Sequence, residues 1–168
     1  MVTLVLPTAV AVLGLVCLSA FFSSSETAIF AVSEEWIDSQ ADGGSGRTLQ
    51  RLREDPHRLL VTILVGNNVV NILITSLTTA VLVETLPTGV AIPAATVLVS
   101  VLVLVFGEIV PKSYGFGTAQ SWALRVARPL AVVERGMGPV VTVFDVVTGA
   151  MSSLVGGDPT MEERFLDE

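Results

Sequence analysis

The first apolar run of the chain reads VTLVLPTAVAVLGLVCLSAFFSSS at residues 2–25, and it contains no charged residue. An α-helix needs about 20 apolar residues to cross a hydrocarbon core roughly 30 Å thick. Two later runs meet the same requirement, so the expected spans cover residues 3–31, 58–83 and 88–112. A cleavable signal peptide explains the first run less well, because no basic segment precedes it. The sequence therefore predicts an all-α integral membrane protein with three transmembrane helices.

The composition also favours a bilayer as the natural solvent. Hydrophobic residues make up 51% of the chain and charged residues only 15%, with a mean hydropathy of +0.73, whereas a soluble domain carries about 25% charged residues. The net charge of -7 and the lack of a Lys/Arg cluster argue against a nucleic-acid partner. Cys17 is the only cysteine, so no intrachain disulfide can form, and we expect it to be a buried apolar side chain.

The basic residues predict how the spans are oriented. All nine Lys and Arg residues lie within residues 47–58 or from residue 112 onward, and none lies before the first span or in the short turn at residues 86–89. Because cytoplasmic segments carry an excess of Lys and Arg, we expect a multi-pass protein of the cell membrane with its N-terminus outside and its C-terminus in the cytoplasm. A fourth crossing within residues 136–157 is a weaker alternative, since the polar face of that segment favours a helix at the membrane surface.

A first amphipathic, juxtamembrane region is expected on the cytoplasmic side at residues 33–55. Ser33 precedes two glutamates and is a suitable N-cap, because its hydroxyl can accept a backbone N–H of the first turn. The glycine-rich residues 42–46 are expected to separate two short helices.

A second juxtamembrane region is expected at residues 117–155, where apolar and polar residues recur at helical spacing. Pro129 and Pro139 are expected to interrupt this region, because proline lacks the N–H that a helix interior needs. The transmembrane domain would then occupy residues 1–157. The acidic residues 158–168 would form a linker.

Polar groups are costly inside a bilayer, so the polar residues of the three spans are the candidates for function. Ser19 and Ser23 are four residues apart, and so are Asn67 and Asn71, which places each pair on one helix face. Either pair could serve packing alone, because Ser and Asn commonly hydrogen-bond across helix interfaces in membranes. The spacing leaves open whether Asn67 or its neighbour Asn68 faces the interior.

A third polar cluster lies near the end of the last span. Pro111 has no N–H and its ring crowds the carbonyl four residues earlier, so the carbonyl of Gly107 is expected to lose its helical hydrogen bond beside Glu108. Broken helices with freed carbonyls coordinate small cations in many transporters. Hydroxyl, amide, carbonyl and carboxylate oxygens together suit a hard cation such as Mg²⁺, Ca²⁺ or Na⁺. Alternatively, Glu108 could simply pair with Lys112, which is four residues away.

Three stretches carry a family resemblance: LSAFFSSSETA at residues 18–28, LVGNNVVN at 64–71 and FGEIVPK at 106–112. In these the sequence resembles the transmembrane domain of the CNNM/CorC magnesium transporter family. The resemblance implies a homodimer in the lipid bilayer that exports magnesium in exchange for sodium entry. It also implies metal ligands at Ser19, Ser23, Asn67, Asn71, Gly107 and Glu108, with Pro111, Lys112 and Asn68 in supporting roles.

Members of that family usually continue into cytoplasmic CBS domains that bind adenine nucleotide, so we expect no nucleotide on a chain that stops at Glu168. No serine–histidine–aspartate constellation, phosphate-binding glycine loop or carboxylate dyad is present, and we expect no enzyme. The alternative function is a non-transporting regulator or anchor whose polar clusters serve helix packing and dimerisation. The sequence leaves open the coupling ion, the direction of transport and magnesium against calcium.

Overall fold

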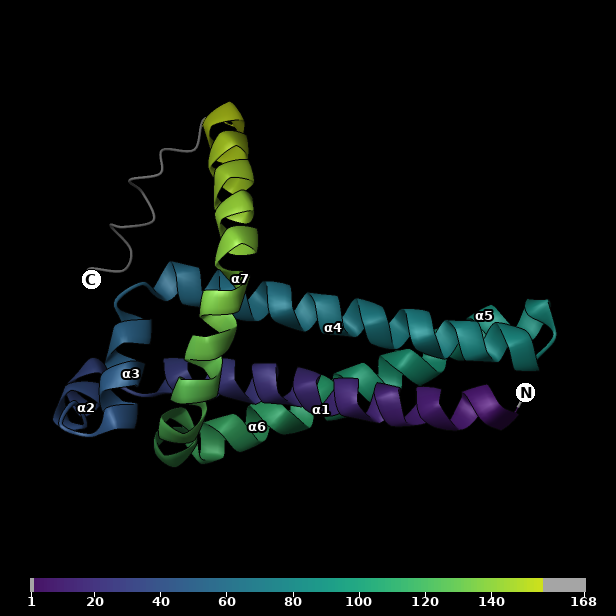
Figure 1. Ribbon diagram of the computed structural model, residues 1–168, viewed down its shortest axis with the longest axis horizontal. Helices are drawn as coiled ribbons and strands as arrows, with labels where there is room; N and C mark the ends of the chain where they lie inside the picture. The colour runs from purple at the N-terminus through teal and green to yellow at the C-terminus, as the bar shows by residue number, and fades with distance from the viewer. Residues whose placement is uncertain (1, 156–168) are drawn as a thin grey trace.

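The computed structural model describes residues 2–155, and every element in that range is helical (Figure 1). In chain order these are α1 (Val2–Ala31), α2 (Glu34–Ser39), α3 (Gly44–Arg53), α4 (Pro56–Thr85), α5 (Thr88–Val101), the π-helix η1 (Leu102–Ile109), α6 (Val110–Gly117) and α7 (Ala119–Val155). Within the described residues, three helical stretches are long and apolar enough to cross a membrane. They are α1, α4 and the continuous stretch formed by α5, η1 and α6. This confirms the all-α membrane fold, while the linker expected at residues 158–168 lies outside the described range.

The three spans form an elongated bundle in which α4 runs antiparallel to both of its neighbours (Figure 1). We call the end near residues 86–87 the turn end, and the opposite end, which holds α2 and α3, the connector end. Helix α1 packs against α4, η1 and α6, and α4 packs against α5. Helix α7 crosses the connector end transverse to the spans, in contact with α1, α3 and α4.

The connector begins as expected from its sequence. The hydroxyl of Ser33 accepts the backbone N–H of Trp36 at 3.4 Å, and Ser33 therefore caps α2. At the start of α4, the carboxylate of Asp55 accepts the N–H of Arg58 at 2.9 Å, and Pro56 occupies the first turn, where a missing N–H costs nothing.

Less of the glycine-rich segment forms a loop than expected, because α3 already begins at Gly44. A side chain at Gly46 would collide with the backbone carbonyl of Gln40, at the end of α2. The glycines therefore let the first turn of α3 pack directly onto the preceding segment, and this close contact compensates for their low helix propensity.

The expectation that Pro129 and Pro139 interrupt the last region is wrong, since both lie inside the single helix α7. A proline in a helix interior costs about 3 kcal/mol. On this helix Leu130 and Val141 are fully buried in the packing against the rest of the protein, and burial of one large apolar side chain contributes about 1.5–3 kcal/mol. Tertiary packing thus outweighs the local preference.

The third span also differs from the expected residues 88–112. It stays helical to Gly117, and the chain does not break at Pro111, which lies in the first turn of α6. The irregularity precedes the proline as the π-helix η1, where the N–H of Val110 bonds to the carbonyl of Val105 five residues back. The five-residue register changes the hydrogen-bond pattern before the missing N–H is reached, so the helix widens instead of ending.

Small residues bring the spans close together around the candidate site. A Cβ atom built on Gly66 of α4 would stand 2.8 Å from the aromatic ring of Phe22 on α1. A side chain at Gly115 of α6 would collide with the backbone carbonyl of Ser24. Close helix approach of this kind is typical of membrane bundles. Cys17, expected to be buried, is exposed on the surface of the single chain.

Candidate ion-binding site between the three spans

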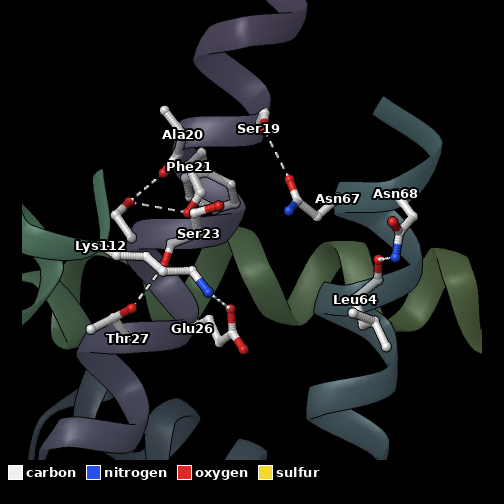
Figure 2. Close-up of polar contacts among 11 residues, drawn as sticks. Ser19, Ala20, Phe21, Ser23, Glu26, Thr27, Leu64, Asn67, Asn68 and Lys112 are labelled. Carbon is white, nitrogen blue, oxygen red and sulfur yellow. Dashed lines mark hydrogen bonds and ion pairs between the residues drawn. The ribbon is translucent and has the colours of Figure 1, made fainter. Parts of the chain in front are cut away.

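Three polar side chains from two spans meet in the middle of the bundle. The hydroxyl oxygen of Ser19 on α1 lies 2.9 Å from the amide oxygen of Asn67 and 2.9 Å from that of Asn71, both on α4. Ser19 is fully buried. Figure 2 shows its contact with Asn67 across the gap between the two helices. The structure therefore brings together three of the residues that the sequence nominated.

The Ser19 hydroxyl has one proton to donate, whereas two amide oxygens lie close enough to accept it. A serine hydroxyl carries one proton, so Ser19 can donate to only one of the two amide oxygens at a time. With the amides oriented as here, the oxygen of the other asparagine faces the serine oxygen with no proton between them, whereas a turned amide would donate an N–H to Ser19. Oxygen atoms that converge in this way form a suitable environment for a cation, because a positive charge is attractive to all of them at once.

Gly107 completes the third side of this cluster from η1. It is buried, and a Cβ atom built on it would stand 2.8 Å from the hydroxyl oxygen of Ser19. Any residue with a side chain would therefore push into the polar cluster. We call Ser19, Asn67, Asn71 and Gly107 the central cluster.

Asn68 points away from the central cluster. Its side chain is exposed, and its amide donates to the carbonyl of Leu64 at 2.9 Å on its own helix (Figure 2). The question that the sequence left open is answered by this geometry: Asn67, not Asn68, faces the interior. Asn68 instead lines a groove on the outer side of α4 with Asn71, Thr75 and Ser76.

Ser23 lies one helical turn from Ser19 toward the connector end. Its side chain is 1% exposed, and its hydroxyl has no hydrogen-bond partner among the described residues. An unpaired buried hydroxyl costs about 1–3 kcal/mol. Ser23 therefore extends the central cluster by one polar group that the described fold does not satisfy.

Glu108 follows Gly107 but does not form the ion pair considered from the sequence. Lys112 instead pairs with Glu26 of α1, at 3.3 Å between the ammonium nitrogen and a carboxylate oxygen (Figure 2). The carboxylate of Glu108 is half-buried and has no ion pair or hydrogen bond within the part of the chain that the structure describes. The cross-helix pair forms because α1 and α6 pack side by side, which sequence spacing does not reveal.

Residues 2–155 contain no group of three or more His, Cys, Asp and Glu side chains that could hold a metal. A cation at the central cluster would therefore be held mainly by neutral oxygens, with Glu108 as the nearest carboxylate in sequence. Such a ligand set suits hard cations and is a poor one for zinc or copper.

At the end of the first apolar run, the sequence favours a helix-end or interhelical role for Glu26 over ion binding, and the structure confirms an interhelical one, because Glu26 of α1 pairs with Lys112 of α6. Its position seven residues after Ser19 places it on the face of α1 that carries Ser19 and Ser23. That spacing was the available signal. Only the structure shows that this face is directed toward Lys112.

Curated relatives align with most of this chain. It is 34% identical over 146 residues to the UPF0053 inner membrane protein YfjD of Escherichia coli, covering 83% of this chain and 33% of that protein. It is 33% identical over 147 residues to a putative chloroplastic DUF21 domain-containing protein of Arabidopsis thaliana, covering 85% of this chain and 22% of that protein. A UPF0053 protein of Haemophilus influenzae is 29% identical over 153 residues, covering 89% of this chain and 36% of that protein. The chain thus spans about a fifth to two fifths of the length of these relatives.

The family model described as the cyclin M transmembrane N-terminal domain matches residues 10–168. The match includes all three polar motifs and both regions outside the spans. With three helices of membrane-spanning length in the described residues, the chain is a multi-pass membrane protein, and it belongs to the cyclin M (CNNM) transmembrane domain family.

Proposed function

We propose that this domain transports magnesium and binds the ion at the central cluster, with Glu108 supplying the negative charge. The observation that carries the proposal is the meeting of Ser19, Asn67 and Asn71, whose three oxygens share a single hydroxyl proton. Magnesium prefers oxygen ligands and keeps part of its water shell. Neutral oxygens with one carboxylate would offset part of the dehydration cost and still allow the ion to leave.

The surroundings of the central cluster differ between the two ends of the bundle. On the turn side, Val16, Ile74 and Val99 are buried and apolar. The first buried polar residue of α4 beyond Asn71 is Thr78, about two turns away. On the connector side, Ser23 and Glu26 continue along the same face of α1. Buried polar residues on one side of membrane spans are typical of ion pathways. We therefore infer that in this conformation the ion enters and leaves from the connector end.

We extend the proposal to orientation, coupling and assembly. The connector end carries Arg47, Arg51 and Arg53, so it would face the cytoplasm and the N-terminus would lie outside the cell membrane. The family resemblance favours export coupled to sodium entry, and sodium would use the same kind of oxygen ligands. A homodimer would cover the polar groove that contains Asn68 on the outer side of α4.

Exchange of single asparagines tests ion binding against helix packing. We expect Asn71→Ala to weaken magnesium binding by about tenfold, because one inward oxygen ligand is lost. Asn68→Ala should leave the affinity unchanged, since Asn68 donates to its own helix. Calorimetric titration of both purified variants with MgCl₂ measures the difference.

The same pair of variants separates the transporter from a non-transporting anchor module. If the central cluster serves packing alone, Asn71→Ala should lower the thermal stability without any effect on magnesium. Interhelical hydrogen bonds in membranes contribute about 0.6 kcal/mol on average, so the loss in stability would be modest. Equal magnesium affinities of wild type, Asn71→Ala and Asn68→Ala would reject the proposed site.

Orientation can be measured by cysteine labelling in intact cells. With Cys17 replaced by alanine, Gly89→Cys should react with a membrane-impermeant maleimide, because Gly89 is exposed at the turn end with nothing near its Cβ position. Asp42→Cys, exposed at the connector end, should react only after the membrane is permeabilised. The reverse labelling pattern would invert the proposed topology.

A further inference from the structure

Lys112 contacts one carboxylate on another helix and has a second one four residues before it in the sequence. Its ammonium group lies 3.3 Å from the carboxylate of Glu26 on α1. Glu108 precedes Lys112 by four residues on the same continuous helical stretch, a spacing at which side chains on one helix can meet. The ammonium group of Lys112 therefore has two possible acidic partners, and in this structure it pairs with Glu26.

Polar side chains on α1 lie between the central cluster and this ion pair. Ser19, Ser23 and Glu26 follow one another along the same face of α1 (Figure 2). Ser23 is 1% exposed and its hydroxyl has no partner among the described residues. The buried hydroxyl is available to an ion that moves from Ser19 toward Glu26.

Two other cations form ion pairs elsewhere among the described residues. Arg53 of α3 lies 3.9 Å from Glu34 of α2, and Arg58 of α4 lies 3.4 Å from Glu134 of α7. Lys112 pairs with Glu26 and is four residues from Glu108, so it is placed to neutralise either carboxylate. The Glu26 and Lys112 side chains are 31% and 47% exposed, so they have room to separate.

We propose that Lys112 is a built-in competitor for the transported cation and alternates between Glu26 and Glu108. This inference rests on the proposed magnesium site. Paired with Glu26, as here, Lys112 leaves Glu108 free for the ion. In the alternative position the ammonium group neutralises Glu108, a carboxylate that is costly at membrane depth without a compensating charge, and the ion must then displace it to bind. The long, flexible lysine stem and its compact charge suit this exchange.

The proposal makes opposite predictions for the two members of the ion pair. Lys112→Gln removes the competitor and should tighten magnesium binding about tenfold. Glu26→Gln releases Lys112 toward Glu108 and should weaken magnesium binding about tenfold. In the double variant Glu26→Gln, Lys112→Gln no ammonium remains, so the affinity should equal that of Lys112→Gln alone.

The experiment uses the full chain in lipid nanodiscs, titrated calorimetrically with MgCl₂, with thermal unfolding measured in the absence of magnesium. Arg58→Gln is the matched control, because it breaks another interhelical ion pair, between α4 and α7, and should change stability but not affinity. Unchanged or weaker binding in Lys112→Gln would overturn the inference. So would an effect of Glu26→Gln that persists in the Lys112→Gln background, since Glu26 would then be a ligand in its own right. If wild type binds no magnesium, the proposed function fails and this inference fails with it.

Discussion

Glu108→Gln should weaken magnesium binding by about 100-fold or more, close to 2.7 kcal/mol of binding free energy. The substitution keeps the size and most of the hydrogen-bonding capacity of the side chain but removes its charge. The central cluster offers only neutral oxygens, so the carboxylate is the main electrostatic compensation for dehydrating Mg²⁺. Calorimetric titration measures the loss, and the protein should still be expressed and folded, because Glu108 has no partner within the described part of the chain.

A control and a second substitution sharpen this result. Glu84→Gln also removes one acidic charge from a span, at an exposed position near the turn end, and should leave the affinity unchanged. If the role of Glu108 were only to neutralise Lys112, then adding Lys112→Met to Glu108→Gln would restore binding. Restored binding in that double variant would remove Glu108 from the ion site.

Gly107→Ala should have the second large effect, because the new methyl group would stand 2.8 Å from the hydroxyl oxygen of Ser19. We expect magnesium affinity to fall at least about tenfold, since the methyl group occupies space in which the oxygens converge. Overpacking should also lower the free energy of unfolding by about 1–3 kcal/mol. Gly117→Ala is the matched control, because nothing lies within 4 Å of its Cβ position.

A double variant separates the two effects of Gly107→Ala. Adding Ser19→Ala removes the hydroxyl oxygen that the methyl group would meet, so stability should recover in Ser19→Ala, Gly107→Ala. Binding should not recover, because a ligand is lost as well. Wild-type affinity in the Gly107→Ala variant would show that the ion does not lie beside Ser19.

Features that depend on local chemistry were predictable from the sequence. Three long apolar runs predicted three spans, because the length and hydropathy of a segment decide whether it can cross a bilayer. Ser33 was predicted to cap α2 and does so, since an N-cap needs only one suitable side chain and its following turn. Helical spacing also placed Ser19 and Ser23, and Asn67 and Asn71, on common faces.

Local rules failed where packing between helices supplies the larger energy. Pro129 and Pro139 were expected to interrupt a helix, yet α7 continues because buried residues such as Leu130 hold it against the bundle. Pro111 was expected to disturb the third span by freeing the carbonyl of Gly107, and the span adopts the π-helix η1 before the proline and stays helical beyond it. In both cases the missing N–H is a fixed local cost that tertiary contacts offset.

The sequence by itself determined which oxygens are available inside the membrane, and the tertiary structure decided which of them meet. The sequence does not distinguish Asn67 from Asn68, since both are neighbouring asparagines in the same span. The rotation of α4 about its axis directs Asn67 toward Ser19 and Asn68 outward. Lys112 had a candidate partner four residues away, but the packing of α6 on α1 gives it Glu26. Such choices depend on the mutual rotation and distance of helices that are far apart in sequence. No local pattern encodes these quantities.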